Sequence, residues 1–302
     1  MIARLANLRT HPSVFRHLTG LTVPVFDHLA AELVPVVEAT HRRSLDRPNR
    51  ERAVGGGGQF DLPAIDQLLL TVIWLRQYPT NEALGFLFGV SDSTASRARA
   101  RCLPHLERAG KDTMRMPDPG VGQRKTWPRL LADLPALNVV IDTFEQRTHR
   151  PKRRQKAHYS GKKKAHTLKS QVGVDEESGR VVDVSESAPG PRADIKVLER
   201  SRLLKRLPTG VGGLGDSAYQ GMGELHPDGL GATPRRKPRG KERPPEDRKY
   251  NRAFSRRRIV VEHAIGRLRR YQAITQGNRH GRKAHAVRVR AIAGLVNRML
   301  DA

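Results

Sequence analysis

The sequence predicts two parts of different class: an all-helical N-terminal region followed by an α/β domain. Apolar side chains recur at helical spacing over residues 64–103. Short apolar runs then appear at 136–142 and 211–216, each ending in an acid, as is typical of buried strands. A long helical pattern over about 246–272 follows. Strands mixed with helices in this way predict a mixed sheet flanked by helices.

The chain begins with a helical segment and a linker. In residues 22–40, Phe26 and Leu29 stand at helical spacing after Thr22, which occupies a capping position, so the first half of this segment is expected to be helical. The run Gly55–Gly58 breaks the pattern and predicts a linker.

The next segment predicts three helices, at about 64–77, 81–88 and 93–103. Pro79 ends the first, and Thr80 can cap the second. The last two are joined by a short Gly-Val-Ser turn, in which glycine supplies a backbone conformation that other residues resist. This arrangement is similar to a helix-turn-helix.

In that motif the second helix enters the major groove of DNA with its N-terminal residues near base edges. Here the helix offers Ser93, Thr94, Arg97 and Arg101 as candidate DNA contacts. The alternative is a helical hairpin whose arginines form a solvated face. The charge of the whole chain favours DNA binding.

That charge is strongly positive. The 302 residues include 56 Lys and Arg against 30 Asp and Glu, a formal net charge of +26. Phosphate contacts by basic side chains contribute affinity for any nucleic acid sequence, so a polyanionic partner is expected. No apolar run approaches the ~20 residues that span a bilayer, and no signal peptide is recognisable, so no membrane partner is expected. The single cysteine, Cys102, cannot form an intrachain disulfide and fits a reducing, cytoplasmic compartment.

Residues after 108 change in character. Prolines and glycines between 114 and 134 predict a linker, and the α/β pattern starts after it. In chain order the expected elements are a strand at 136–142, a hairpin of 165–174 and 180–187 with Gly179 in its turn, a helix at 193–207, strands at 211–216 and, more weakly, 229–234, and helices at about 246–272 and 284–299.

Three acids in this domain are candidate metal ligands. Asp142 and Asp216 each end an apolar strand, and Glu262 is the only acid between Asp247 and Asp301, among fifteen Lys and Arg. Cleavage of a phosphodiester needs an activated oxygen nucleophile and neutralised phosphate charge. Two divalent ions roughly 3.5–4 Å apart supply both. Mg²⁺ prefers carboxylate ligands, and two aspartates with a glutamate suffice.

Each acid taken alone also has a simpler structural interpretation. Asp216 could cap a helix that begins at Ser217, and Glu262 could pair with Arg258 one turn away. Asp142 could end its strand without further role. Single residues therefore favour the structural interpretation over catalysis.

Three other acids rank below these candidates. Glu145 lies an odd number of residues after Asp142, so an extended strand would point it to the opposite face. Asp183 lies in the expected hairpin and Asp194 at the start of a helix, where capping is the simpler role.

In combination, the motifs resemble a known family. They are "VVIDTFEQR" around Asp142, "YSGKKKAHTLKSQV" at 159–172, "GDSAYQG" at 215–221 and "RRRIVVEHAIGRLRR" around Glu262. The chain resembles the DDE transposases of bacterial insertion sequences, in the insertion-sequence-five group related to Harbinger elements. That resemblance implies a ribonuclease-H-like catalytic domain preceded by the helix-turn-helix region. It also implies Asp142, Asp216 and Glu262 as a catalytic triad that binds two Mg²⁺ ions, for which Mn²⁺ substitutes.

The family pattern around its glutamate is Tyr, two residues, Arg, three residues, Glu, six residues, Lys or Arg. Arg258, Glu262 and Arg269 match it, and the resemblance makes the two arginines candidate DNA contacts. Ser255 stands at the tyrosine position. The first acid is followed by Thr143 and Phe144 instead of the commoner Gly-Thr.

A basic run precedes the expected hairpin. Ten Lys and Arg and no acid lie between Glu145 and Asp175. Lys162, Lys163 and Lys164 could follow a DNA backbone next to the metal site, or the run could be a solvated loop.

Together these observations predict residues 1–60 as a helical segment with a Gly-rich linker, 61–108 as the helix-turn-helix region, 109–133 as a linker and 134–302 as the catalytic domain. The expected activity is metal-dependent cleavage at transposon ends followed by transfer of the 3′-hydroxyl to target DNA. Terminal inverted repeats and target DNA are the expected partners of a homo-oligomer, taken as a dimer, in the bacterial cytoplasm at the nucleoid. A nuclease or resolvase that cuts without joining, and a non-enzymatic DNA-binding regulator, remain alternatives.

Overall fold

The structure is a computed structural model and describes residues 2–46, 62–119, 134–135, 137–153, 155–240 and 242–302. The expected linker at Gly55–Gly58, and residues 120–133 of the second linker, lie outside the described residues. The chain divides into two compact units, which are described separately. The helical unit comprises Met1–Asp112, Arg270–Gln276 and Arg290–Ala302, and the α/β unit comprises Thr113–Arg269 and Gly277–Val289. The four-part division expected from the sequence stays a prediction.

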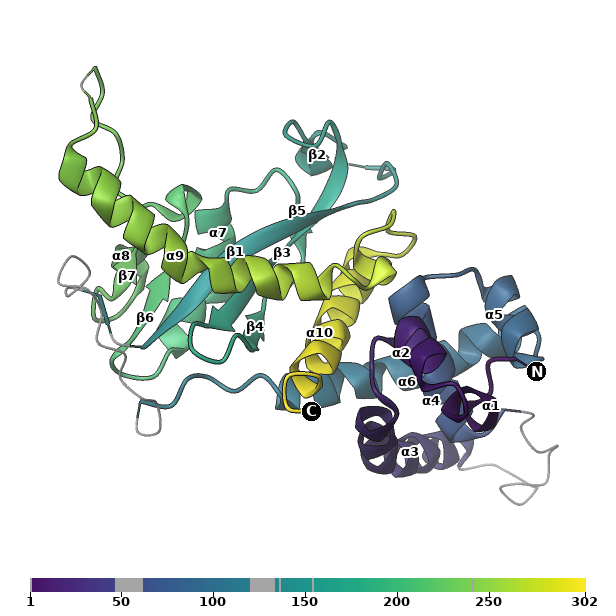
Figure 1. Cartoon of the computed structure of the whole chain (residues 1–302). Helices are drawn as coiled ribbons and strands as arrows, with labels where there is room; N and C mark the ends of the chain where they lie inside the picture. The colour runs from purple at the N-terminus through teal and green to yellow at the C-terminus, as the bar shows by residue number, and fades with distance from the viewer. Residues whose placement is uncertain (1, 47–61, 120–133, 136, 154, 241) are drawn as a thin grey trace. The chain divides into compact units, whose positions relative to one another are not determined.

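Helices form the N-terminal part of the helical unit (Figure 1). Two short helices were not predicted, because each has too few residues to show a periodic pattern. The helices are α1 (Leu5–Arg9), α2 (Pro12–Thr19), α3 (Val23–Leu45), α4 (Ala64–Gln77), α5 (Asn81–Phe88) and α6 (Asp92–Asp112).

The bounds of α4 and α5 agree with those expected, whereas two helices are longer. α3 continues through Pro35, and α6 continues through Pro104. Leu106 and Ala109 are buried in the continuation of α6, so packing outweighs the local cost of the proline. Among the described residues, no single helix is long and apolar enough to cross a membrane, although α2 and α3, bent by 60°, pass that test as a pair by length and composition only.

The core of the helical unit surrounds α4. Every residue from Asp66 to Leu75 is buried, and the guanidinium of Arg99 stacks over the ring of Trp74 at 4.3 Å from its centroid. Cys102 is buried as well, and burial raises the pKa of its thiol to about 11. This thiol is therefore a core side chain.

The α/β unit is built on one mixed sheet with the strand order β2-β3-β1-β6-β7, and β4 and β5 also pair with β3. β1 is antiparallel to β3 and parallel to β6. The strands are β1 (Leu137–Arg147), β2 (Tyr159–Ser160), β3 (Ala165–Asp175), β4 (Val181–Val184), β5 (Ala188–Pro189), β6 (Val211–Leu214) and β7 (Gly231–Ala232).

The expectation that the first strand ends at Asp142 is wrong. β1 continues five residues further, because its pairing with β3 continues as far as Arg147 opposite Thr167. The acid therefore lies within a strand whose backbone is held on the β3 side. The turn of the expected hairpin is confirmed, with Gly179 at a φ of +68° between β3 and β4.

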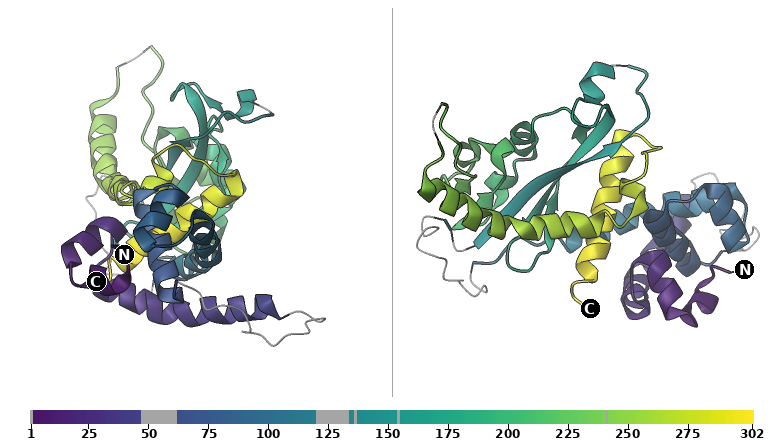
Figure 2. Two further views of the ribbon diagram at one scale, coloured as in Figure 1. Left: turned by 90° about the vertical axis from the view of Figure 1, so that its right-hand side faces the viewer. Right: turned by 45° about the horizontal axis from the view of Figure 1, so that its top comes forward.

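Helices cover both faces of the sheet (Figures 1 and 2). α9 lies across one face, against β1 and β3, and α7 lies on the other. The helix expected at 193–207 is interrupted at Arg202, whose φ of +53° ends α7 before a 3₁₀ turn. The helical segments are α7 (Asp194–Ser201), α8 (Met222–Leu225), α9 (Pro245–Leu268), α10 (Arg282–Arg298) and 3₁₀ turns at Gln155–His158, Leu203–Arg206, Ser217–Tyr219 and Gln272–Ile274.

Alternation along β1 divides its side chains between two cores. Val139 and Ile141 pack in a cluster with Leu198 of α7 and Tyr219. Successive side chains of a strand point to opposite faces, so Asp142 lies on the α9 face. The chain thus forms the mixed α/β fold expected of a ribonuclease-H-like domain, with Asp142 under its long helix.

Two arginines attach α9 to the β3–β4 hairpin. Nε and Nη2 of Arg257 each donate to Glu176 at 2.5 Å, and Asn138 of β1 donates to the same carboxylate. Arg267 donates to the carbonyl of Gly179 at 2.7 Å. Arg257 is only 4% exposed, so its ion pair with Glu176 is buried. Because this pair is held by several hydrogen bonds, it opposes rotation of α9 about its own axis.

A buried imidazole predicts that acid destabilises the α/β unit. His285 of α10 is fully buried, and its Nδ1 lies 2.7 Å from Ser187 Oγ. Burial, with Arg288 nearby, lowers its pKa to about 3. Between about pH 6.5 and 3 the unfolded state therefore binds a proton that the folded state does not, and stability falls by up to ~1.4 kcal/mol per pH unit.

His285→Gln should flatten this part of the stability profile, as measured by urea unfolding at intervals from pH 7 to pH 4. The exposed His263→Gln is the matched control and should keep the wild-type slope. Parallel profiles for all three proteins would exclude His285 as the source.

Candidate active site and DNA interface

The parallel register of β1 and β6 brings two of the predicted acids together. The last parallel pair is Val140 opposite Leu214, and Asp142 and Asp216 each lie two residues beyond it. Both side chains are half-buried. Asp216 lies within electrostatic range of Asp142, since its charge contributes to the raised pKa of Asp142.

Glycines allow β6 to lie this close to its neighbours. A Cβ on Gly213 would approach Leu204 to 2.5 Å, and one on Gly215 would approach Tyr219 to 2.7 Å. These glycines face the apolar cluster, so Asp216 points to the opposite side, which is the α9 face. In "VGGLGD", Gly213 and Gly215 therefore allow close packing on one face, and Asp216, the next residue, points to the other face.

Burial and like charges act together on Asp142. Burial raises its pKa, and the neighbouring Asp216 and Asp194 add to that shift. The backbone N–H of Thr143 donates to Asp142 Oδ1 at 2.7 Å, and Arg258 lies 3.6 Å from Asp142 Oδ2; both oppose the shift. A cation bound beside the carboxylates would relieve the same repulsion.

Glu262 does not join the two aspartates in this structure. It is exposed on α9, one turn after Arg258, whose guanidinium pairs with Asp142. Side chains four residues apart lie about 6 Å from one another on a helix, so Glu262 is a neighbour of Arg258 on α9. Within the described part of the chain, no group of three or more His, Cys, Asp and Glu side chains could hold a metal ion.

Of the simpler structural roles considered for the three acids, all of them described residues, the structure shows the cap by Asp216 but not a pair between Glu262 and Arg258. Asp216 does cap the 3₁₀ turn that follows, since Ala218 N–H donates to its Oδ1 at 2.9 Å. Arg258 pairs with Asp142, the partner that the sequence did not suggest. The cap uses one oxygen of Asp216, and a carboxylate has further acceptor positions.

The lower-ranked acids have structural partners. Asp183 pairs with Arg206 at 2.8 Å. Glu145 accepts from Thr167 at 2.6 Å, and Asp194 pairs with Lys169 at 2.6 Å. Lys169 is a residue that sequence reasoning did not single out. It was counted within a basic run, and only its position opposite Glu145 in the β1–β3 register could have distinguished it.

The helix-turn-helix consists of α5, a turn and α6. Thr80 caps α5 through Ala83 N–H at 3.2 Å, and Gly89 has a φ of +64° in the turn. Ser91 Oγ accepts from Thr94 N–H at 3.2 Å and so caps the first turn of α6. The Ser91 cap and the glycine together fix the direction in which α6 leaves the turn.

The candidate DNA contacts on α6 separate into two groups. Ser93 and Arg97 are exposed on its N-terminal turns, and Thr94 is half-buried beside them. Arg97 Nη2 lies 3.4 Å from Ser93 Oγ and 3.3 Å from Thr94 Oγ1. Arg101, in contrast, donates to Gln67 of α4 at 2.5 Å, so its guanidinium is already engaged within the helical unit.

Comparison with known proteins agrees with these two parts. The family described as "DDE superfamily endonuclease" matches residues 141–297, and "Helix-turn-helix of DDE superfamily endonuclease" matches residues 60–112. The chain belongs to the DDE superfamily of endonucleases. It is 27% identical to the "Probable transposase for insertion sequence element IS702" of Microchaete diplosiphon over 290 residues. The aligned region covers 94% of this chain and 93% of the relative. No solved structure matches the chain.

The resemblance to a DDE transposase of an insertion sequence is thus confirmed, and with it DNA as the partner and a nuclease-type activity. DDE superfamily endonucleases generally use divalent metal ions. The finer predictions, which are the triad, the ions and strand transfer, are taken up as proposals below.

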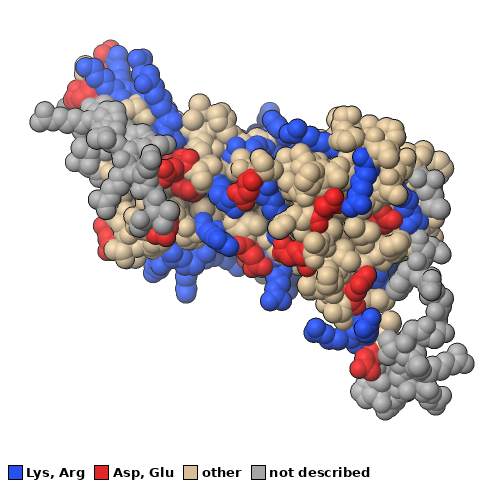
Figure 3. Space-filling view, turned by 60° about the horizontal axis from the view of Figure 1, so that its bottom comes forward, with Lys and Arg blue, Asp and Glu red and all other residues tan. Residues whose placement is uncertain are grey.

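Three lysines of the basic run of this DDE endonuclease lie in the turn between β2 and β3. Lys162, Lys163 and Lys164 are all exposed there, and Lys163 N–H donates to Ser160 Oγ at 3.3 Å. Figure 3 shows Lys and Arg side chains spread over the face that it presents, with acids among them. The exposed lysines of this turn are sterically able to reach a phosphate backbone.

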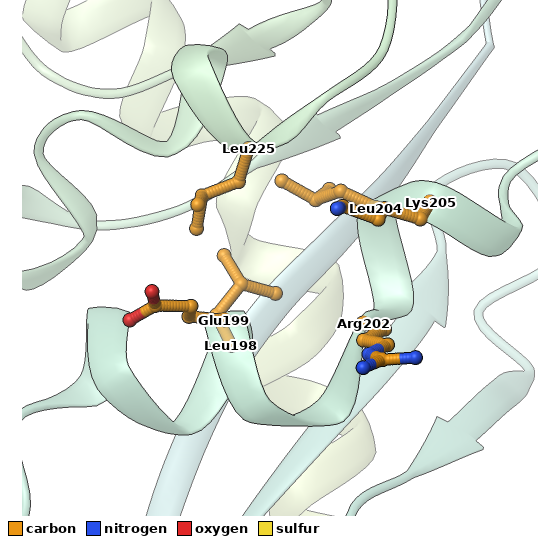
Figure 4. Close-up of a pocket in the computed structure, with 6 residues that line it drawn as sticks. All are labelled: Leu198, Glu199, Arg202, Leu204, Lys205 and Leu225. Atoms are coloured by element: carbon orange, nitrogen blue, oxygen red, sulfur yellow. The ribbon is translucent and has the colours of Figure 1, made fainter.

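A small cavity lies away from the aspartates, on the α7 face. Its volume is about 270 Å³, and Figure 4 shows Leu198 and Leu225 pointing toward each other across it. The six lining side chains, all described, include none of the three predicted acids. The cavity belongs to the apolar packing of α7 and α8 and not to the proposed site.

The exposure of Arg97 predicts a role in reading DNA sequence. Arg97→Ala should reduce discrimination between the element's ends and random DNA, since a bidentate arginine–base contact is worth ~1–3 kcal/mol. Competition binding with the two DNAs measures this. Arg108→Ala, exposed near the other end of α6, is the control and should leave the discrimination unchanged. Equal weakening on both DNAs by Arg97→Ala would make it a phosphate contact.

Proposed function

We propose that this chain cleaves phosphodiester bonds at the ends of an insertion element and transfers the freed 3′-hydroxyl to target DNA, with Mg²⁺ as cofactor. One observation carries the proposal. Asp142 and Asp216 each follow the last parallel pair of β1 and β6 by two residues and lie within electrostatic range of one another, and the neighbouring helix α9 carries Arg258, which pairs with Asp142, and Glu262. Paired carboxylates next to phosphate-binding cations are what metal-dependent phosphodiester chemistry requires.

The donor set suits hard divalent ions. Asp142 and Asp216 supply carboxylate oxygens, and Mg²⁺ takes the rest of its shell from water and substrate phosphate, so two or three protein ligands suffice. Mn²⁺ accepts the same ligands. When bound, the ions would activate the attacking oxygen and neutralise charge on the phosphate. Asp142 and Asp216 would hold them, with Glu262 as the third ligand.

In this proposal Glu262 becomes a metal ligand when Arg258 leaves Asp142. The guanidinium that pairs with Asp142 is a strong ligand for phosphate, and a DNA backbone would compete for it. Release of Arg258 to the DNA backbone would leave Asp142 without its counter-charge, and Glu262 stands exposed one helical turn after Arg258 on α9. DNA binding and completion of the metal site are then one event.

The two chemical steps share this site. In the first, water attacks phosphorus and the bond to the 3′-oxygen breaks, giving a 3′-hydroxyl and a 5′-phosphate. In the second, that hydroxyl attacks a target phosphodiester and displaces its 3′-oxygen, so the number of phosphodiester bonds is conserved. The chain's part is to hold both DNA strands in line at Asp142 and Asp216.

The other proposed contacts follow the exposed basic residues. Ser93, Thr94 and Arg97 of α6 read the terminal inverted repeats, with Arg101 supporting the helix through Gln67. The lysine turn at 162–164 and Arg269, exposed just after α9, bind the backbone near the chemistry. We further propose a homodimer on DNA, in the bacterial cytoplasm, because one site per element end requires two copies.

Removal of single carboxylates tests the triad. Asp142→Asn, Asp216→Asn and Glu262→Gln should each lower Mg²⁺-dependent cleavage of element ends by at least ~10²-fold while DNA binding is kept, since each removes a metal ligand and no basic group. Glu246→Gln, an exposed glutamate in the first turn of α9, is the matched control and should cleave normally. Near-normal cleavage by one variant removes that residue from the triad.

Strand transfer needs its own assay. Pre-cleaved element ends with a free 3′-hydroxyl, incubated with supercoiled plasmid and Mg²⁺, should give covalently joined products, as resolved on a denaturing gel. Nicked or cut plasmid without joined products would instead favour a nuclease that does not join.

A further inference from the structure

Thr143, the residue after Asp142, makes two hydrogen bonds in opposite directions. Its backbone N–H donates to Asp142 Oδ1 at 2.7 Å. Its side-chain hydroxyl donates to Asp194 Oδ1 at 3.0 Å, on the other face of the sheet. One residue therefore connects a proposed metal ligand to an acid that the triad does not use.

Asp194 is itself held by a buried lysine. Lys169 Nζ donates to Asp194 Oδ1 at 2.6 Å and to the carbonyl of Arg192 at 2.7 Å. Lys169 is 7% exposed and stands opposite Glu145 in the β1–β3 register, with Nζ 4.0 Å from Glu145 Oε1. Its ammonium thus has partners on three sides, and its charge is compensated within the network.

These contacts are costly to form and therefore need an explanation. A buried ion pair is not in itself stabilising, because loss of water offsets its attraction, but it holds its members in one geometry. Breaking one member leaves a buried charge unpaired. The Lys169–Asp194 pair contacts Thr143, the residue after Asp142. At that place the pair can orient the Asp142 carboxylate, even if it adds little to the free energy of folding.

We propose that Lys169, Asp194 and Thr143 form a positioning unit that fixes the direction of the Asp142 carboxylate for metal binding. This inference rests on the proposed function of Asp142. Groups that hydrogen-bond metal ligands orient them, and their loss typically lowers metal affinity 10–100-fold. Lys169 fixes Asp194, Asp194 fixes the Thr143 side chain, and the Thr143 backbone N–H fixes Asp142 Oδ1.

The network provides its own matched control. Thr167 is a buried threonine that, like the half-buried Thr143, donates its hydroxyl to a carboxylate, here Glu145 at 2.6 Å, but it makes no contact with Asp142 or Thr143 in the described network. Thr143→Val and Thr167→Val each remove one hydroxyl from the same sheet and keep the shape of the side chain. Thr143→Ser keeps the hydroxyl and should restore the wild-type behaviour.

The experiment titrates each full-length variant, in complex with element-end DNA, with Mn²⁺ as the only divalent ion and follows free Mn²⁺ by electron paramagnetic resonance, with thermal unfolding in parallel. Thr143→Val should weaken Mn²⁺ binding ~10-fold or more, and Asp194→Asn should do the same. Thr143→Ser and Thr167→Val should bind as wild type. The Mg²⁺ concentration for half-maximal cleavage of element ends should rise by a similar factor in Thr143→Val.

Two further results separate the possible failures. If Asp142→Asn binds Mn²⁺ as well as wild type, the proposed metal site itself is wrong. If Asp142→Asn loses binding while Thr143→Val and Asp194→Asn keep it, or if Thr167→Val loses as much as Thr143→Val, the positioning unit is overturned and the network is structural. Should Thr143→Val fail to fold, Asp194→Asn against Thr167→Val decides the question in the same way.

Discussion

The site depends first on the pairing of β1 with β6. A parallel pair aligns equivalent positions of two strands, so two acids at the same distance beyond Val140 and Leu214 must lie side by side. Apolar residues on one face of β1 and glycines on the same face of β6 determine which way the acids point. A slip of β6 by one residue on β1 would turn Asp216 toward the apolar cluster and away from Asp142, and an unpaired charge there is very costly.

The second constraint is the rotation of α9. Its apolar stripe would permit some rotation on the sheet, but Arg257 and Arg267 attach it to the β3–β4 hairpin at points five residues before and after Glu262. With the helix so held, Arg258 faces Asp142 and Glu262 lies on the flank beyond it. The hairpin turn, far from the aspartates along β3, thereby determines what the helix presents to them.

Much of the fold could be predicted from the sequence, because helical and strand periodicities are local. The bounds of α4 and α5 and the capping role of Thr80 followed from a few neighbouring residues. The continuation of β1 past Asp142 did not, because it depends on hydrogen bonds to β3. Motif spacing identified the three acids, but spacing does not show that Arg258 reaches Asp142 while Glu262 stays exposed.

The remaining feature is a concentration of acids in a chain with a net charge of +26. Asp194 and Asp216 both lie within electrostatic range of Asp142, and Asp194 and Asp142 have different counter-charges. Lys169 neutralises Asp194 from a buried position, where it donates to Asp194 and to the carbonyl of Arg192. Arg258 pairs with Asp142 across a longer distance of 3.6 Å, from a helix that also faces solvent. One counter-charge is thus structural and the other exchangeable, which suits the proposed site because it would have to accept both cations and phosphate.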